Sequence, residues 1–275
     1  MHMKWHYTVA AQSDVGTTKA VNQDSLTVKV ANTVCGEAAF AVMCDGMGGL
    51  EQGEVASATV VRAYEQWFLK DLPQLLARGF SEELLEQVWR CLANDCNTRI
   101  MDYSKGQNTA MGTTLTAMLL LEGRYYISHV GDCRVYVMGN GMEQLTTDQT
   151  YVAREVALGH MTPEQARTDA RRNVLLQCIG TVNSVKPDFL MGDFYDNDTF
   201  LVCSDGFRHK LTDAELYDYC HTALEGMEWF VENRLNNSHF MNGRLRYLME
   251  NIKARGERDN ISAIVIKAVN TIESL

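Results

Sequence analysis

The amino-acid sequence predicts an α+β sandwich, and three observations support that fold class. Apolar or alternating runs of strand length recur throughout the chain. Amphipathic helical segments come in pairs between these runs, instead of one helix after each strand. No proline-rich or serine-rich linker divides the 275 residues, of which 46% are hydrophobic. We therefore expect one domain spanning residues 1–275.

The first helical pair is predicted from apolar residues spaced at i, i+3, i+4 and i+7 on either side of Ser81, a typical N-cap. We expect two amphipathic helices joined near Pro73 that pack as an antiparallel pair. Apolar stripes of this kind are explained more simply by a core than by a cofactor. The residues that form the stripes are Val60, Ala63, Tyr64, Trp67, Phe68, Leu85, Val88, Trp89, Leu92, Ala93 and Cys96.

Two further helices and two hairpins follow from local signals. A third helix is predicted to begin at Thr162, with Pro163 in its first position and Gln165 completing a capping box. A fourth is expected within residues 213–255, which are rich in Tyr, Trp, Leu and Met. The other segments are predicted as strands, with hairpin turns at 122–124 and 139–141.

Asp45 is the most informative residue for function. It ends the apolar run AFAVMC and opens a turn that contains three glycines and one methionine. A buried strand that ends in an acid, followed by flexible backbone, is typical of oxygen sites for hard divalent cations. Read alone, the segment is equally consistent with an ordinary strand and glycine turn.

Four more aspartates repeat this pattern. Asp132 and Asp205 follow the apolar runs YYISHVG and TFLVCS, while Asp24 and Asp259 precede strand-like segments. If the strands lie side by side, the five carboxylates meet along one sheet edge, where they repel one another unless a divalent cation holds them ionised. The alternative is that they are common strand-end turn aspartates, which five repeats make less favoured.

Eight motifs in order make the chain resemble the metal-dependent type 2C serine/threonine protein phosphatases, in particular the compact bacterial members. The resemblance covers nearly the whole chain and extends the predicted fold to a four-layer αββα sandwich. This is an architecture of two antiparallel sheets flanked by helix pairs, with a metal site in the cleft at one end. The motifs are VNQDS (21–25), CDGMGG (44–49), GTTLTAMLL (112–120), VGDCRVY (130–136), LTTDQT (145–150), RNVLLQCIG (172–180), CSDGF (203–207) and RDNIS (258–262).

The resemblance implies a role for each motif aspartate. Asp45 would bridge two metal ions, the Gly46 carbonyl would bind the first ion, and Asp205 and Asp259 would hold the second. Asp24 would be hydrogen-bonded to metal-bound water or bind the metal through that water. Oxygen ligands without His or Cys favour Mn²⁺ or Mg²⁺ over zinc.

A third, weaker metal site is implied at Asp132. Its support is reduced because His209 stands where many eukaryotic relatives carry another aspartate. The site would then depend on Asp132 and Asp205.

The implied activity is hydrolysis of phosphoserine and phosphothreonine in proteins by a water that bridges the two ions. The chain would then be a protein-serine/threonine phosphatase that acts in signalling and opposes a kinase. One alternative is a catalytically silent module of the same fold that binds phosphoproteins. Another is a hydrolase for a small phosphate ester, which would need a closed pocket. The presence of Asp24, Asp45, Asp205 and Asp259 together favours the active phosphatase.

Three other positions depart from the family pattern. Lys19 replaces the usual phosphate-binding arginine, which keeps the charge but loses the bidentate fork. A solvated loop lysine is the alternative. Met47 replaces a histidine that is thought to act as general acid, so a metal-bound water remains as the proton donor. Gln149 replaces another histidine at the start of a variable flap, expected at about 148–180.

Composition is consistent with a soluble cytoplasmic enzyme. With 25 basic and 35 acidic residues, the net charge of −10 disfavours nucleic acid and anionic membranes as partners. Apolar runs are too short to span a bilayer. We expect a monomer whose eight cysteines are reduced thiols, because none forms a CxxC pair, and a core role for His129.

The predicted flap carries alternating charges at Arg154, Glu155, Arg167, Asp169, Arg171 and Arg172. Such a pattern suits contact with a phosphoprotein, although a charge run is more often a solvated face.

Overall fold

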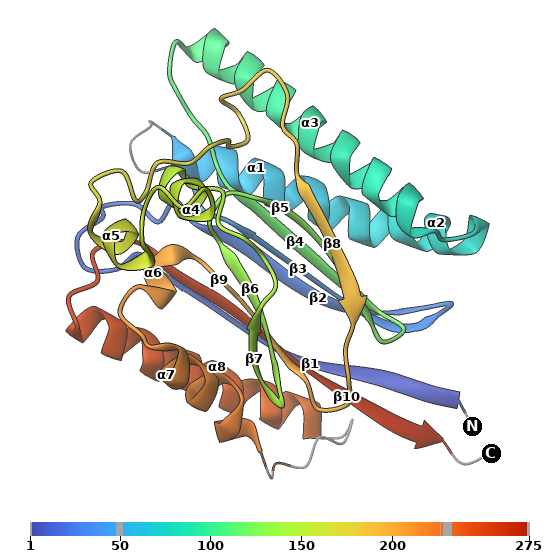
Figure 1. The fold of residues 1–275 in the computed structure, drawn as a ribbon. Coiled ribbons are helices and arrows are strands. Elements are labelled where there is room, and N and C mark those ends of the chain that lie inside the picture. The colour runs from blue at the N-terminus through green and yellow to red at the C-terminus, as the bar shows by residue number, and fades with distance from the viewer. Residues whose placement is uncertain (1, 48–51, 226, 228–232, 274–275) are drawn as a thin grey trace.

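Two antiparallel five-stranded sheets form the centre of the molecule (Figure 1). The computed structural model describes residues 2–47, 52–225, 227 and 233–273. One sheet has the order β1-β10-β9-β6-β7, and the other has the order β2-β3-β4-β5-β8. The strands are β1 (His2–Asp14), β2 (Ser25–Thr33), β3 (Gly36–Cys44), β4 (Leu115–Leu121), β5 (Arg124–Val130), β6 (Arg134–Gly139), β7 (Gly141–Gln144), β8 (Asp188–Asp193), β9 (Thr199–Cys203) and β10 (Ile261–Glu273).

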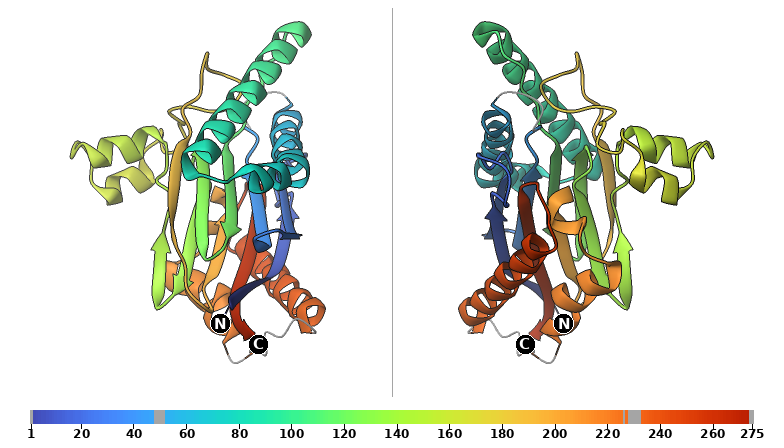
Figure 2. Two further views of the ribbon diagram at one scale, coloured as in Figure 1. Left: turned by 90° about the vertical axis from the view of Figure 1, so that its right-hand side faces the viewer. Right: turned by 90° about the vertical axis from the view of Figure 1, so that its left-hand side faces the viewer.

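Helices cover the outer face of each sheet, which gives the predicted four layers (Figure 2). On one side lie α1 (Gly53–Gln66), the π-helical segment η1 (Trp67–Asp71), α2 (Leu72–Arg78) and α3 (Glu82–Gln107). On the other lie α7 (Asp213–Cys220), the short 3₁₀ helix η2 (Thr222–Leu224) and α8 (Arg234–Ala254). The αββα sandwich predicted from the sequence is therefore confirmed.

Burial of both sheet faces explains why the central strands β3, β4 and β9 are almost wholly apolar. Along β3, Phe40 and Val42 face the helices α1 and α3, whereas Ala41 and Met43 face the sheet that contains β9 and β10. Strand β10 divides in the same way. Its residues Ala263 and Val265 face α7 and α8, and Ile264 and Ile266 face the sheet that contains β3 and β4. Successive side chains on a strand point to opposite faces, so one run of residues serves two cores.

The helix that contains Pro73 corrects the sequence prediction. The chain does not turn near Pro73, because this residue occupies the first turn of α2, where a missing N–H is tolerated. The chain reverses at Gly79, the residue after the end of α2, where φ is +113°. Ser81 then caps α3, as predicted, by accepting a hydrogen bond from Leu84 N at 3.2 Å.

Other local predictions are confirmed, with one exception. The helix α5 (Pro163–Thr168) begins with the predicted capping box of Thr162 and Gln165. Hairpins join β4 to β5 and β6 to β7 at the predicted turns. The single fourth helix expected in 213–255 is instead two helices, α7 and α8, with part of the intervening chain outside the described residues.

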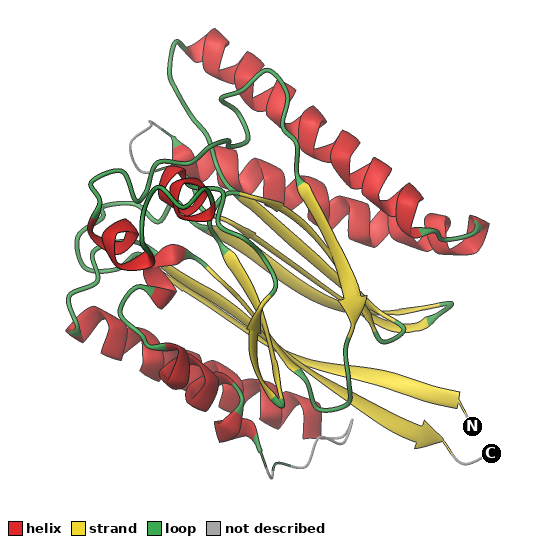
Figure 3. Cartoon of the chain, in the orientation of Figure 1, coloured by secondary structure: helices red, strands yellow, loops and turns green. Residues whose placement is uncertain are grey.

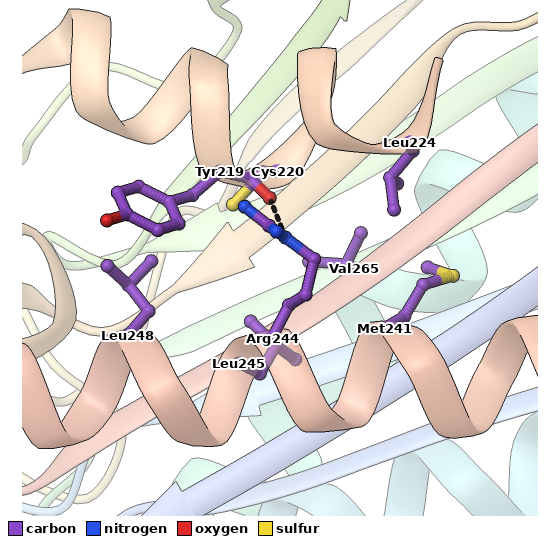
Figure 4. A pocket seen from close by; sticks show the side chains of 8 residues that line it. All are labelled: Tyr219, Cys220, Leu224, Met241, Arg244, Leu245, Leu248 and Val265. Atoms are coloured by element: carbon purple, nitrogen blue, oxygen red, sulfur yellow. Dashed lines mark hydrogen bonds between the residues drawn. The ribbon is translucent and has the colours of Figure 1, made fainter. Parts of the chain in front are cut away.

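The contact between α7 and α8 includes a small pocket (Figure 4). The Arg244 guanidinium lies over the Tyr219 ring, with 5.2 Å from Cζ to the ring centroid, and Nε donates to Tyr219 O at 3.3 Å. The volume of about 10 Å³ holds at most about one water. We therefore interpret this pocket as a packing gap.

The long loops gather at one end of the two sheets, around α4 (Tyr151–Ala157), α5 and α6 (Asp205–Arg208) (Figure 3). The segment predicted as a flap contains α4 and α5, which stand away from the sandwich (Figure 2). Within the described part of the chain, no helix is long and apolar enough to cross a membrane. All eight cysteines are free thiols, as predicted.

Asn97 on α3 fixes the chain that returns from the flap. Its side chain accepts a hydrogen bond from Gly180 N at 2.7 Å and donates to Val182 O at 2.8 Å. Next to Gly180, Ile179 exchanges two backbone hydrogen bonds with Thr113. Because Thr113 also donates to Asp45 O at 2.9 Å, this buried amide connects α3 to the end of β3.

We expect Asn97→Ala to lower the free energy of unfolding by about 1–3 kcal/mol, because it leaves the buried N–H of Gly180 and the partly buried carbonyl of Val182 without this partner. Urea denaturation measures the change. Thr59→Ala is the matched control, since the Thr59 hydroxyl bonds only within its own helix, to Val55 O. Equal stability of the two variants would contradict this role for Asn97.

Candidate active site

Asp24 and Asp45 are neighbours because β2 and β3 are antiparallel. Ser25 pairs with Cys44, so Asp24 precedes one strand where Asp45 follows the other. Thr114 holds the Asp45 backbone from both sides, since its hydroxyl accepts from Asp45 N at 2.8 Å and its own N–H donates to Asp45 O at 2.9 Å. The end of β3 is therefore rigidly placed.

The sheet that contains β9 and β10 contributes Asp205 and Asp259 in the same way. Asp205 follows β9 and is the first residue of α6. Asp259 lies two residues before β10, which is the antiparallel neighbour of β9. The prediction that the five acids meet along the edge of one sheet is therefore wrong. Instead, the aspartates come from two sheets and face one another at their common end.

Asp132 lies where the chain crosses from one sheet to the other, between β5 and β6. Its carbonyl accepts from Arg208 Nη2 at 3.3 Å, and the same nitrogen lies 3.3 Å from Asp148 Oδ2. Arg134 donates to both oxygens of Asp148, at 2.7 and 2.8 Å. This ion-pair network fixes α6 against the loop that carries Asp132. No motif in the sequence indicated a role for the members of this network.

The carboxylates interact strongly with one another. Burial raises the pKa of Asp45 well above its usual range, and the charges of Asp24, Asp205, Asp132 and Asp259 raise it further. Burial also raises the pKa of Asp24 to about 7, with a contribution from Asp205 and opposition from nearby serine hydroxyls. Five like charges in a poorly solvated place favour protonation or a bound cation.

Burial raises the pKa of Asp132 to about 7 as well, and the charge of Asp205 adds to the rise, while Arg208 opposes it. Asp132 therefore belongs to the same cluster of interacting acids as Asp24 and Asp45.

Several oxygens in this cluster are suited to a cation. Both carboxylate oxygens of Asp24 and one of Asp205 are buried without a hydrogen-bond partner among the described residues. Buried acceptors of this kind are costly unless a cation or donor satisfies them. Across the ranges that the structure describes, no three His, Cys, Asp or Glu side chains converge tightly enough to enclose a metal ion. Mutual repulsion among the carboxylates opposes such convergence. The assignment of a metal site therefore depends on the kind of donor atoms present, which are carboxylate oxygens.

Lys19 points into the cluster and forms an ion pair with Asp259, at 2.9 Å from Nζ to Oδ1. Burial lowers the pKa of Lys19, but the hydrogen bond to Asp259 and the charges of Asp45 and Asp205 outweigh it, so the net pKa is raised. The Lys19 side chain is 32% exposed. The ion pair and the partial burial argue against the alternative of a solvated loop lysine.

Close packing requires glycine at position 46. A Cβ there would lie 2.5 Å from Gly53 O and 2.6 Å from Gln23 O. Gly46 N also donates to Gln23 O at 3.1 Å, which fixes the turn after Asp45. Met47 N donates to Gly112 O at 3.0 Å. The last two glycines of the CDGMGG motif lie outside the described residues.

Gln149 is a buried structural residue. Its amide oxygen accepts from Gly131 N and from Gln177 Nε2, both at 3.1 Å, and its amide nitrogen donates to Asp188 Oδ2 at 2.8 Å. It therefore joins the base of the predicted flap to β5 and β8. His129 has the core role expected of it, since burial lowers its pKa and its ring bonds to the Thr116 hydroxyl at 3.0 Å.

His209 lies between two acids, with Nε2 3.7 Å from Asp205 Oδ2 and Nδ1 3.9 Å from Glu257 Oε2. Glu257 is buried, and its Oε1 accepts from the N–H groups of Arg258 and Asp259 at 2.7 and 3.0 Å. The Asn260 side chain binds three backbone groups of the loop that carries Lys19, at Val15, Val21 and Gln23. The RDNIS motif contains Asn260, but from the sequence only its Asp259 was predicted to have a role.

The Protein phosphatase 2C family model matches residues 16–250. The serine/threonine phosphatase stp of Listeria innocua is 28% identical over 230 residues, which cover 82% of this chain and 83% of that protein. The serine/threonine protein phosphatase PstP of Mycobacterium tuberculosis is 30% identical over 264 residues, or 95% of this chain. Those residues are 45% of PstP, so the chain spans less than half the length of that relative.

Solved structures agree with the sequence relatives. The serine/threonine phosphatase Stp1 of Staphylococcus aureus superposes with a TM-score of 0.77 at 26% identity, covering 100% of this chain and 98% of that one. The catalytic domain of PstP in complex with two manganese ions gives 0.71 at 27% identity, covering 98% of this chain and 100% of that one.

The chain belongs to the protein phosphatase 2C family, and it resembles the bacterial members. The prediction that it is an enzyme of the serine/threonine phosphatase class is confirmed by these relatives.

The raised pKa of Asp24 predicts a stability effect that changes sign with metal. Since its pKa of about 7 in the fold lies above the ordinary 3.8, its contribution to stability is complete below about pH 4. That contribution is lost as pH rises through about 7. In EDTA at pH 8, Asp24→Asn should therefore raise the free energy of unfolding, by on the order of 1–3 kcal/mol, with a smaller gain at pH 5, where less of the contribution is lost.

In Mn²⁺ the order should reverse, because the wild type gains binding free energy that the variant loses. Thermal melts at both pH values, with and without the metal, measure the effect. Asp218→Asn, at an exposed site on α7, is the control. Destabilisation by Asp24→Asn in EDTA at pH 8 would contradict the interpretation.

Proposed function

We propose that the protein is a metal-dependent phosphoprotein phosphatase that hydrolyses phosphoserine and phosphothreonine. The observation that carries this proposal is a cluster of five aspartates at the shared end of the two sheets: Asp24, Asp45, Asp132, Asp205 and Asp259. The negative charges of the other four all raise the pKa of Asp45. The buried oxygens of Asp24 and Asp205 that lack a protein partner in the described ranges support a cation there.

Two Mn²⁺ or Mg²⁺ ions suit this all-oxygen set, and a relative described with two manganese ions supports manganese. Asp45 would bridge them, the Gly46 carbonyl would bind one, and Asp205 with Asp259 would bind the other. When bound, such ions lower the pKa of a shared water and neutralise charge on the phosphoryl oxygens. Asp132 would hold a third, weaker ion.

The chain's own side chains then position the reactants. Asp24, fixed beside Asp45 by the β2–β3 register, can accept a hydrogen bond from the attacking water. Lys19 carries a full positive charge at the rim of the cluster, where it can bind the substrate phosphate as a point charge. Met47 has no proton to give to the leaving alkoxide, so the side chain at this position is no general acid.

The shape beside the site supports a protein substrate over a small ester. An open groove of about 1270 Å³ begins at Asp132 and Glu257. Sites for small molecules are typically closed clefts of about 300–1,000 Å³. An extended loop of a phosphoprotein fits the open form better, and such a substrate implies an opposing serine/threonine kinase. We propose that the enzyme acts in signalling, as a monomer.

The silent regulatory module is the less favoured alternative. A protein that only bound phosphoproteins would have no use for buried acids with unsatisfied oxygens, because these destabilise the metal-free fold. The relatives at 28–30% identity are named as phosphatases.

Hydrolysis of p-nitrophenyl phosphate and of a phosphothreonine peptide tests the proposal. We expect turnover in Mn²⁺, which EDTA abolishes and which Asp45→Asn reduces by about 10³-fold or more, because the charge stabilisation depends on that carboxylate. Asp218→Asn should behave as wild type. Turnover that survives EDTA would exclude the metal mechanism, and no turnover by folded protein in either metal would favour the silent module.

Lys19 provides a second test. We expect Lys19→Ala to reduce kcat/KM for the phosphothreonine peptide by about 10- to 100-fold, as loss of a charge-assisted hydrogen bond predicts. Lys19→Arg should retain most activity. The control is Lys29→Ala, which removes a lysine paired with Glu65 on the surface. Equal kcat/KM for wild type and Lys19→Ala would exclude a phosphate-binding role.

A further inference from the structure

A groove extends from the carboxylate cluster between two walls. The flap helices α4 and α5, with residues 172–173, form one wall, and residues 208–216 at α6 and α7 form the other. Asp132 and Glu257 close the end beside the site, and β6 residues line the floor. The groove volume is about 1270 Å³.

This groove is cationic although the whole chain carries a net charge of −10. Six Arg or Lys residues line it against four Asp or Glu residues. The cations are Arg134, Arg167, Arg172, Arg208, Lys210 and Arg258, and the acids are Asp132, Asp148, Asp213 and Glu257. Arg134 and Arg208 form ion pairs with Asp148, which leaves four cations of the groove without an ion pair in the described part of the chain.

These four cations are exposed, and among the described residues none of their side chains has a hydrogen bond or an ion pair. Arg167 and Arg172 come from the flap wall, whereas Lys210 and Arg258 come from the opposite side. Arg167 acts on Glu164 only through longer-range attraction. An anion in the groove would therefore face positive charge from both walls.

The remaining charges of the flap are neutralised locally. Arg171 donates to both oxygens of Asp169, at 3.0 and 2.8 Å, and lies 4.3 Å from the Tyr151 ring centroid. Arg154 pairs with Glu155 at 3.2 Å. Within the charge run noted in the sequence, only Arg167 and Arg172 are left to act on a ligand. The run is therefore more than a uniformly solvated face.

We propose that this groove binds acidic residues that flank the phosphorylated residue of the substrate, so that the enzyme prefers phosphoproteins whose phosphosite is followed or preceded by Asp or Glu. The inference rests on the proposed function, since the groove begins at the site that would hold the phosphate. Carboxylates of an extended peptide fit open walls with separated charges. The neighbouring aspartates repel such residues, so selectivity arises only along the groove.

The test compares three phosphothreonine peptides of one length, with flanking residues that are Asp and Glu, Asn and Gln, or Lys. The quantity measured is the ratio of kcat/KM for the acidic peptide to that for the neutral peptide, which cancels any change in basal turnover. We expect the wild-type ratio to be about 3–10 at low salt, as a few exposed ion pairs predict. The ratio should fall toward one at 0.5 M salt.

Two double variants examine the two walls separately. Arg167→Gln with Arg172→Gln should reduce the ratio to near one, and Lys210→Gln with Arg258→Gln should reduce it similarly. The matched control is Arg62→Gln with Arg246→Gln, which removes the same charge from exposed positions on α1 and α8 and should keep the wild-type ratio. The control separates a local groove effect from the effect of net charge.

The outcomes are distinct. Hydrolysis of all three peptides with equal kcat/KM would overturn the groove assignment and leave the phosphatase proposal intact. Loss of the preference in the control variant as well would overturn it in favour of general electrostatic steering. Hydrolysis of none of the peptides would overturn the proposed function itself.

Discussion

Mutual repulsion among buried carboxylates is the constraint on which the arrangement of this protein depends. Burial and neighbouring charge raise the pKa of Asp45 well above its usual range and bring those of Asp24 and Asp132 to about 7. A fold that holds such charges together must be stabilised elsewhere. Three apolar cores, one between the sheets and one beneath each helical layer, provide that stability.

Polar side chains then hold the strand ends that carry the acids. Thr114 grips Asp45 through two hydrogen bonds, Asn97 connects α3 to the chain that pairs with Thr113, and Asn260 fixes the loop of Lys19. Two residues that differ from the family pattern, Lys19 and Gln149, are held by the same kind of polar contact. Gln149 makes hydrogen bonds at the flap base through a side chain that does not titrate, and Lys19 forms an ion pair with Asp259.

Charge is separated along the molecule. The acids converge at the shared end of the sheets, and four cations without partners among the described residues line the adjoining groove. This separation gives an acidic protein a local surface for anions, which net charge alone would not predict.

The sequence by itself determined the local features and the family. Capping by Ser81 and Thr162, both hairpins and the five acids depend on residues a few positions apart, so they can be recognised without tertiary structure. Only the tertiary structure decided that the acids come from two sheets, that the chain reverses at Gly79, and that Lys19 meets Asp259, 240 residues away along the chain. The tertiary structure also showed which flap arginines are paired with acids, Arg154 and Arg171, and which face the groove, Arg167 and Arg172. These relations depend on strand pairing and packing between distant segments, which local periodicity does not encode.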